Sequence, residues 1–240
     1  MLTSYITATQ NLLQSPGAPT SLYSTSNITL WVNTARGQLA GESESVRYLG
    51  TISTVVGQRN YNFSAINTGA SATNGIQGPI HVRRIMYNVG NGQQWMAPRS
   101  WPWFDLYHLN NPVPVNDTPS VWAQYAQGAG GSFYLDPAPD DTYTLNCDLV
   151  CYPIPLVDDT TVEAIPYLWT DAIPYYAAYL ALLSSQTSAR QADAKRMFDM
   201  FTMFTQRARD FSNPDVNKGM YSQAGDPTAA NRLGVKVGGG

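Results

Sequence analysis

The sequence has 240 residues, of which 43% are hydrophobic and only 13% are charged, and its formal net charge is −3. Charged residues make up about a quarter of an average soluble protein, so neutral polar and aromatic side chains must cover much of this surface, a composition that suits wide protein–protein contacts. The arginines at Arg83-Arg84 and at Arg207 and Arg209 are too few for a nucleic-acid-binding face, so no grip on DNA phosphates is expected.

Two helices are predicted at the start of the chain. Ser15-Pro16-Gly17 is expected to stop the first, and Gly41 the second. The second is predicted to begin at Ser26-Asn27, whose side-chain oxygens can cap a helix. Apolar residues recur at intervals of three and four in both segments, at Leu2, Tyr5, Ile6, Thr9, Leu12 and Leu13 in the first and at Ile28, Trp31, Val32, Ala35 and Leu39 in the second.

The middle of the chain is rich in β-branched and aromatic residues. Residues 46–56 and 59–66 are predicted to form a hairpin around Gly57-Gln58. A further strand is expected at 80–89, with residues 93–96 pairing back onto it. The aromatic cluster at 101–107, punctuated by prolines, is interpreted as a plug in the core.

A second hairpin and the most regular strand follow. Residues 121–127 and 132–135 flank the loop Gly128-Ala129-Gly130-Gly131, which predicts a hairpin. Residues 142–152 alternate between apolar and polar side chains, as in a half-buried antiparallel strand. Cys147 and Cys151 lie on the apolar face of this strand and are too far apart along it for a disulfide between them. We interpret both as buried apolar side chains.

The chain then returns to helical periodicity. One helix is predicted near 172–183 and another from about 190 to 211, whereas residues 213–240 are polar and Gly-rich and are expected to be an extended arm that orders against a partner. The predicted stripes contain Ala172, Tyr175, Tyr176, Tyr179, Leu180 and Leu183 in the first helix, and Ala194, Met197, Phe198, Phe201, Phe204, Ala208 and Phe211 in the second.

These elements predict an α+β fold. Residues 1–45 and 160–211 would form a helical bundle, residues 46–159 a central antiparallel β sandwich or barrel inserted into it, and residues 212–240 the C-terminal arm.

Motifs for catalysis or cofactor binding are not found. His81 and His108 lack metal-ligand spacing, and no nucleophile elbow or phosphate-binding loop occurs. The sequence therefore predicts no enzyme, no cofactor and no metal site. The first residues lack a signal peptide's basic start and apolar run, and no segment approaches the roughly 20 apolar residues of a membrane span.

Two alternatives from other classes remain open. Trp95, Trp101, Trp103 and Trp122 could stack on sugars in a carbohydrate-binding β module of a phage tail or receptor-binding component, provided that they are exposed. Asp105 and Asp140 could serve as the two carboxylates of a cell-wall glycosidase, although nothing else in the sequence supports that reaction.

Four stretches carry a family pattern through their order and spacing. The segment 131–211 contains Phe133-Tyr134-Leu135-Asp136-Pro137-Ala138-Pro139-Asp140, then the strand from Tyr143-Thr144-Leu145 to Tyr152-Pro153-Ile154-Pro155-Leu156, then an acidic linker from Asp158-Asp159 to Pro166 that leads into a helix at 169–183. Trp31-Val32-Asn33-Thr34-Ala35-Arg36 and Gln38-Leu39-Ala40-Gly41-Glu42-Ser43 fit the second helix of the same family. The pattern resembles the head-to-tail adaptor proteins of tailed phages, and residues 57–119 depart from it most.

The resemblance implies a structural virion protein in the neck between capsid and tail, made in the cytoplasm of the bacterial host. Such adaptors form a closed ring, commonly twelve-fold, through heterologous contacts between copies. The implied partners are further copies of the chain, the portal protein and a tail or nozzle protein, and DNA would pass through the lumen without specific binding.

The resemblance also implies where these partners would bind. Portal contact is expected of residues 194–240, and tail contact of the loops at 69–78 and 110–119. The candidate portal-contact residues are Phe198, Phe211, Met220, Tyr221, Leu233, Val235 and Val237.

Overall fold

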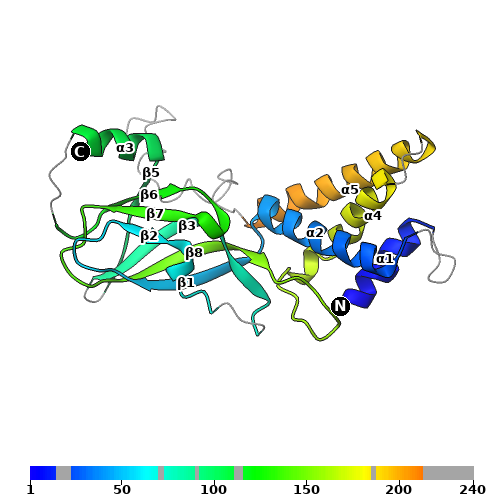
Figure 1. Ribbon diagram of the computed structural model, residues 1–240, viewed down its shortest axis with the longest axis horizontal. Coiled ribbons are helices and arrows are strands. Elements are labelled where there is room, and N and C mark those ends of the chain that lie inside the picture. Colours follow the sequence, from blue (N-terminus) through cyan, green and yellow to red (C-terminus); the bar gives the residue numbers. More distant parts are fainter. Residues whose placement is uncertain (15–22, 70–72, 90–91, 111–115, 185–187, 213–240) are drawn as a thin grey trace, which may run out of the picture.

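The computed structural model describes residues 1–14, 23–69, 73–89, 92–110, 116–184 and 188–212. The molecule is elongated, with helices from both ends of the chain forming one half and strands from its middle forming the other (Figure 1). This arrangement confirms the predicted α+β fold with a β insertion between terminal helices. The predicted C-terminal arm lies outside the described residues.

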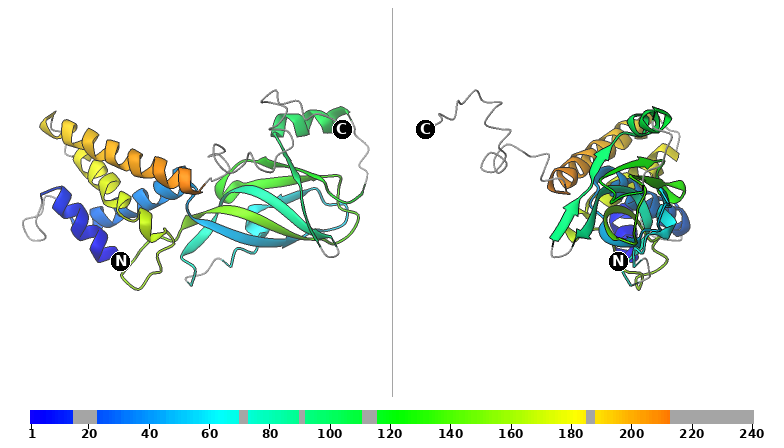
Figure 2. Two further views of the ribbon diagram at one scale, coloured as in Figure 1. Left: turned by 180° about the vertical axis from the view of Figure 1, so that it is seen from behind. Right: turned by 90° about the vertical axis from the view of Figure 1, so that its left-hand side faces the viewer.

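Four helices build the helical half: α1 (Leu2–Leu12), α2 (Thr25–Ser43), α4 (Ala172–Ser184) and α5 (Ser188–Ser212). Helix α5 packs on α4 and α2, whereas α1 packs on the other side of that pair. Figure 2 shows the same order from behind, with α5 along one edge of the bundle and the N-terminus near the opposite edge. Leu39, Ala177 and Phe201 are among the buried residues at the centre of the bundle.

Both boundaries predicted for α2 were wrong. The hydroxyl of Ser24, rather than Ser26 or Asn27, accepts the capping hydrogen bond, which the Asn27 backbone N–H donates over 3.2 Å. At the other end, Gly41 continues the helix, and the left-handed residue that terminates it is Glu44, with φ of 54°. Glycine is the usual residue at such a position, so a glutamate there could not be recognised as a helix end from the sequence.

The face predicted for α4 was also wrong. The buried residues are Ala177, Ala178, Ala181 and Leu182 near the helix centre, whereas Leu183 is exposed and Tyr175, Tyr176 and Tyr179 are only half-buried. Small residues on the packed face allow α4 to approach α2 and α5 closely, and the tyrosines lie at the margin, where they contact aromatic rings of α5.

The β half consists of two four-stranded sheets. The first has the order β1 (Arg47–Ser53), β8 (Thr144–Pro153), β3 (Ile76–Val89), β4 (Gly92–Trp95), and the second has the order β2 (Asn60–Asn62), β7 (Ser132–Asp136), β6 (Val121–Tyr125), β5 (Ala97–Arg99). All pairs are antiparallel except β5 with β6. Short 3-10 helices lie at Phe63–Ala65 (η1), Gly128–Gly130 (η2) and Tyr167–Trp169 (η3), and helix α3 spans Trp101–Asn110.

Two of the three local pairings predicted for the β half are confirmed. Strand β4 pairs back onto β3, and β6 and β7 form the hairpin around Gly128–Gly130. The hairpin predicted from residues 46–56 and 59–66 is wrong, because β1 pairs with β8 and β2 pairs with β7 in the other sheet. Strand β8 buries Leu145, Cys147, Leu149 and Cys151, as predicted, and Val150 on the other face is buried as well.

One hydrophobic core runs through both halves. Its residues include Ile28 and Val32 of α2 as well as Leu145 and Leu149 of β8 and Phe133 of β7. Helix α3 lies outside this core: Phe104 is buried, but Trp103, Leu106 and Tyr107 are exposed. The prediction that residues 101–107 plug the core was therefore wrong, although Phe104 is buried.

Candidate assembly surfaces

A buried ion pair joins the helical half to the segment that leaves the β half. The Arg36 side chain is 0% exposed, and its Nη2 lies 2.7 Å from Oε1 of Glu163. The same guanidinium donates through Nη1 to the backbone oxygen of Ile154 over 2.7 Å. The hydroxyl of Tyr5 donates to the other oxygen of Glu163 over 2.9 Å. Burial, together with the charge of Glu163, raises the pKa of Tyr5 far above its ordinary value, so this hydroxyl stays protonated.

The segment after β8 is held to the bundle at two further points. The side-chain amide of Asn33 accepts from the backbone N–H of Leu156 over 2.7 Å and donates to its oxygen over 3.0 Å. The carboxylate of Asp159 accepts from the N-terminal amine of Met1 over 2.6 Å and from the backbone N–H of Thr3 over 2.8 Å. These bonds hold the pKa of Asp159 below its usual range.

The C-terminal end of α5 is fixed to the first sheet. Arg47 of β1 and Arg83 of β3 both donate to the backbone oxygen of Ser212, over 3.4 and 3.3 Å. Arg83 also pairs with Glu44, and Arg47 with Asp148. Cationic side chains at a helix C-terminus donate hydrogen bonds to its last carbonyl oxygens and stabilise the negative end of the helix dipole. They also fix the C-terminal end of α5 against the first sheet.

His81 lies at the margin of this cluster. Its Nε2 is 3.8 Å from Glu44, and burial lowers its pKa despite that carboxylate. This setting gives His81 a structural role beside the cluster, and the side chain of His108 lies outside what the structure describes.

Two of the candidate portal-contact residues are described. Phe198 and Phe211 of α5 are 41% and 76% exposed. Phe198 contacts Tyr179 of α4, and Phe211 contacts Trp169 of η3, with ring centroids 5.0 and 5.6 Å apart. The other five candidates, Met220, Tyr221, Leu233, Val235 and Val237, lie outside the described residues. The exposure of Phe198 and Phe211 leaves portal contact a prediction.

Aromatic and cationic side chains meet on the outer side of the β half. Trp95 is 53% exposed beneath Arg84, and Trp103 of α3 is exposed beneath Arg99. Trp122 is only 4% exposed, and Trp101 packs against Tyr125 and Tyr134. Two of the four tryptophans proposed for sugar stacking are therefore open, but an arginine covers a face of each.

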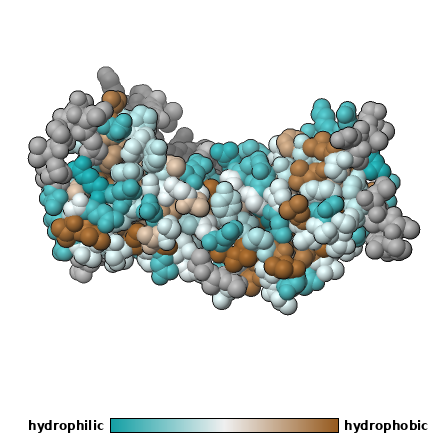
Figure 3. Space-filling view, viewed as in Figure 1, coloured by the Kyte–Doolittle hydropathy of each residue, from teal (hydrophilic) through white to brown (hydrophobic). Residues whose placement is uncertain are grey.

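The space-filling view agrees that apolar side chains reach the surface in both halves (Figure 3). In the β half they include Leu49, Leu106 and Tyr125. Near the helical half they include Val157, Tyr167 and Leu168 on the segment between β8 and α4, all more than two-thirds exposed. Exposed apolar groups that gather in patches are typical of surfaces that bind partners.

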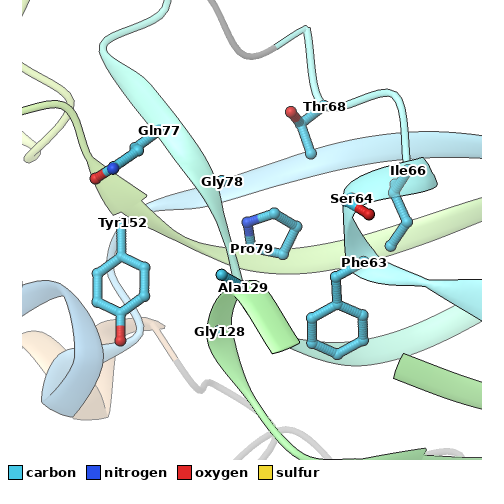
Figure 4. Close-up of a pocket in the computed structure, with 10 residues that line it drawn as sticks. All are labelled: Phe63, Ser64, Ile66, Thr68, Gln77, Gly78, Pro79, Gly128, Ala129 and Tyr152. Carbon is cyan, nitrogen blue, oxygen red and sulfur yellow. The ribbon is translucent and has the colours of Figure 1, made fainter. Parts of the chain in front are cut away.

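A hollow of about 580 Å³ opens between the two sheets, lined by residues of η1, β3, η2 and β8 (Figure 4). Phe63, Pro79 and Tyr152 form much of its wall. Among the described residues, the lining has no carboxylate, histidine or cysteine, so these residues supply no acid–base pair. A concave and mostly apolar wall of this kind can receive an apolar group.

The two carboxylates considered for glycoside hydrolysis lie in different segments of the β half. Asp105 is exposed on α3, whereas Asp140 precedes β8 and accepts a hydrogen bond from Tyr143 over 2.7 Å. Cys147 and Cys151 are free and buried, as predicted. Within the described ranges, no cluster of three metal-ligating side chains occurs, and none of the helices there is long and apolar enough to cross a membrane.

The predicted tail-contact loops are only partly described. Residues 76–78 belong to β3, and residue 110 ends α3. Residues 70–72 and 111–115 lie outside the described part. Sequence reasoning missed the outer surface of α3 and the exposed segment after β8, because it placed the first in the core and treated the second only as a linker. The exposed valines beside Asp158 and Asp159 were the available signal.

Exposed apolar and aromatic side chains on both halves are the main surface features of the described residues. A family model for the SU10 adaptor protein matches residues 2–219. The chain therefore belongs to the SU10 adaptor family of phage head-to-tail adaptor proteins, which confirms the resemblance seen in the sequence. A comparison with curated proteins found no match. Membership makes the chain a virion component and implies contacts with the phage portal and tail proteins.

Proposed function

We propose that copies of this chain close into a ring between the portal and the tail, and that DNA passes through the ring without being held. The observation that carries this proposal is the match to the adaptor family over residues 2–219. The net charge of −3 and the small number of clustered basic residues in the sequence support a lumen that does not bind phosphates tightly. The ring would hold twelve copies, as the family resemblance suggests, and would not catalyse a reaction.

The two halves of each subunit bind different partners. Residues 1–45 and 160–211 form the bundle, and residues 46–159 form the β domain. Portal contact belongs to α5, through Phe198 and Phe211, and to the arm at 212–240. Tail contact belongs to the β domain, where α3 and Trp95 join the loops at 69–78 and 110–119.

The test of this function is a mass measurement on the purified chain, alone and after mixing with its portal protein. We expect a discrete complex that contains one ring of the portal and a fixed number of copies of this chain. A chain that stays monomeric and does not associate with portal rings would contradict the proposal.

The carbohydrate-binding alternative now rests on Trp95 and Trp103, because Trp122 is buried. It predicts that the Trp95→Ala and Trp103→Ala variants lose binding to host surface glycans. The adaptor proposal predicts that the unaltered chain does not bind these glycans at all, so a glycan array with the wild-type chain separates the two functions.

A further inference from the structure

The segment after β8 projects an ordered apolar surface. We define the linker loop as residues 156–163. Val157 at its start is 80% exposed, and Val162 near its end is also exposed. Single exposed valines are common on protein surfaces. They indicate a binding surface only if the loop that carries them is ordered.

Side-chain bonds fix the linker loop along its whole length. Asn33 holds Leu156, the N-terminus holds Asp159, and buried Arg36 holds Glu163. Within the loop, Asp158 accepts from the backbone N–H groups of Thr160 and Thr161 over 2.9 and 3.0 Å. A loop that is ordered in the free chain loses little conformational entropy when a partner covers it. The valines are therefore presented on a preorganised surface.

Outside its ion pairs with the Met1 amine and Arg36, the linker loop carries only negative charge. The sequence contains no lysine or arginine between Arg99 and Arg190, although ten aspartates and glutamates lie in that interval. Asp158 and Asp171 are both exposed on or near the loop. A partner surface that complements the loop must therefore be apolar and cationic.

Helix α5 carries a surface of that kind. Arg196, Met200, Met203 and Arg207 follow one another at spacings of four, three and four residues, so they lie on one face of the helix. We call this set the α5 stripe. It lies opposite the buried residues Ala194, Phe201 and Ala208. Among the residues that the structure describes, neither Arg196 nor Arg207 has an ion-pair partner.

The two surfaces are on opposite sides of the bundle. The linker loop is bonded to α1 and α2, whereas the α5 stripe faces away from α4 and α2, on which α5 packs. Figures 1 and 2 show the loop near the N-terminus at one edge and α5 along the other. Two different and complementary faces on opposite sides are what a heterologous contact between identical copies requires.

From these observations we propose that the linker loop of one copy packs on the α5 stripe of the next copy. Val157 and Val162 contact the two methionines, whose flexible side chains adapt to such a surface, and Asp158 lies beside Arg196 or Arg207. This contact rests on the proposed ring and deepens it, because it names the faces that join neighbouring subunits.

The test uses charge exchange at exposed apolar positions in the full chain, assembled with the portal. The Val157→Lys variant places a cation against the arginines of the stripe, and Met203→Glu places a carboxylate against the acidic loop. Each is expected to reduce the assembled fraction by at least about tenfold, because like charges are costly at an interface. The double variant restores opposite charges and is expected to recover most of the assembly.

Two controls separate assembly from folding. The Val55→Lys variant changes another exposed valine, one that lies in the β half, and should assemble like the wild type. Urea unfolding midpoints of all variants should match that of the wild type, since every altered side chain is solvent-exposed.

A second readout is disulfide cross-linking. The Val157→Cys/Met203→Cys variant should give a ladder of oligomers on oxidation, and neither single variant should, because the native cysteines are buried. If the wild type assembles, yet Val157→Lys and Met203→Glu assemble equally well and no ladder forms, this contact is wrong and the ring stands. If the wild type does not assemble with the portal, the proposed function fails and this contact fails with it.

Discussion

At the scale of single residues, Arg36 and Glu163 show how the two halves are joined. Removing one partner of a buried ion pair leaves an uncompensated charge. We therefore expect Arg36→Met to lower the free energy of unfolding by about 3–5 kcal/mol, as measured by urea denaturation. The Arg36→Met/Glu163→Leu variant should recover much of this loss, because no buried charge remains.

The matched control for this prediction is Lys195→Met, which makes a similar change at an exposed position of α5. Its effect should stay within about 0.5 kcal/mol. A loss below about 1 kcal/mol for Arg36→Met would mean that the buried network does not hold the segment after β8 to the bundle.

The buried thiols make stability depend on alkaline pH. Burial raises the pKa of Cys147 and of Cys151 to about 12 from an ordinary value of 9.0. Above pH 9 the unfolded chain loses these protons while the folded chain keeps them, so their contribution to stability is complete below pH 9 and is lost as the pH rises toward 12.

This dependence is measured by urea denaturation at pH 8 and pH 10. The wild type should lose more stability between these values than the Cys147→Ala/Cys151→Ala variant, and its thiols should react with Ellman's reagent only after unfolding. Equal pH dependence of the two proteins, or rapid reaction of the folded wild type, would show that the thiols are not shielded as the structure indicates.

At the scale of elements, substitutions in α4 test which face of this helix packs against the rest of the bundle. Ala177 and Ala181 are fully buried where α4 contacts its neighbours. Ala177→Leu should therefore overpack the bundle and lower the free energy of unfolding by about 1–3 kcal/mol. The control is Leu183→Ala on the exposed side, which should cost less. Thermal unfolding of both variants decides between this face and the one expected from sequence periodicity.

The sequence predicted the positions of helices and strands more reliably than it predicted which elements pack or pair together. Periodicity located the terminal helices and strand β8, because each repeat reflects one buried face. It failed for α4, where alanines pack and larger tyrosines lie at the margin. It also failed for β1, because its partner β8 lies about a hundred residues further along the chain and local turn signals carry no information about that pairing.

The candidate surfaces were predictable only in part, for a related reason. Low charge and abundant aromatic residues indicated a protein that binds other proteins over wide surfaces, but they did not locate those surfaces. The exposure of Trp103 depends on how α3 packs, and the order of the linker loop depends on Asn33 and Arg36, which lie far away in the sequence.

At the scale of the whole molecule, the C-terminal segment separates portal binding from folding. A chain that ends at Ser212 keeps the described helices and strands, so its unfolding midpoint should change little. If residues 213–240 contact the portal as proposed, this truncation should weaken portal binding by at least about tenfold in a sedimentation assay. Unchanged binding would assign the portal contact to the bundle alone, and Phe211→Asp would then test α5.

The most direct test of the adaptor account is a cryo-EM map of the neck in the intact phage particle. We predict several copies of this chain in a closed ring around the DNA axis, with α5 toward the portal and the β half toward the tail. A map that places the chain elsewhere in the virion, or as single copies without neighbours, would contradict the account.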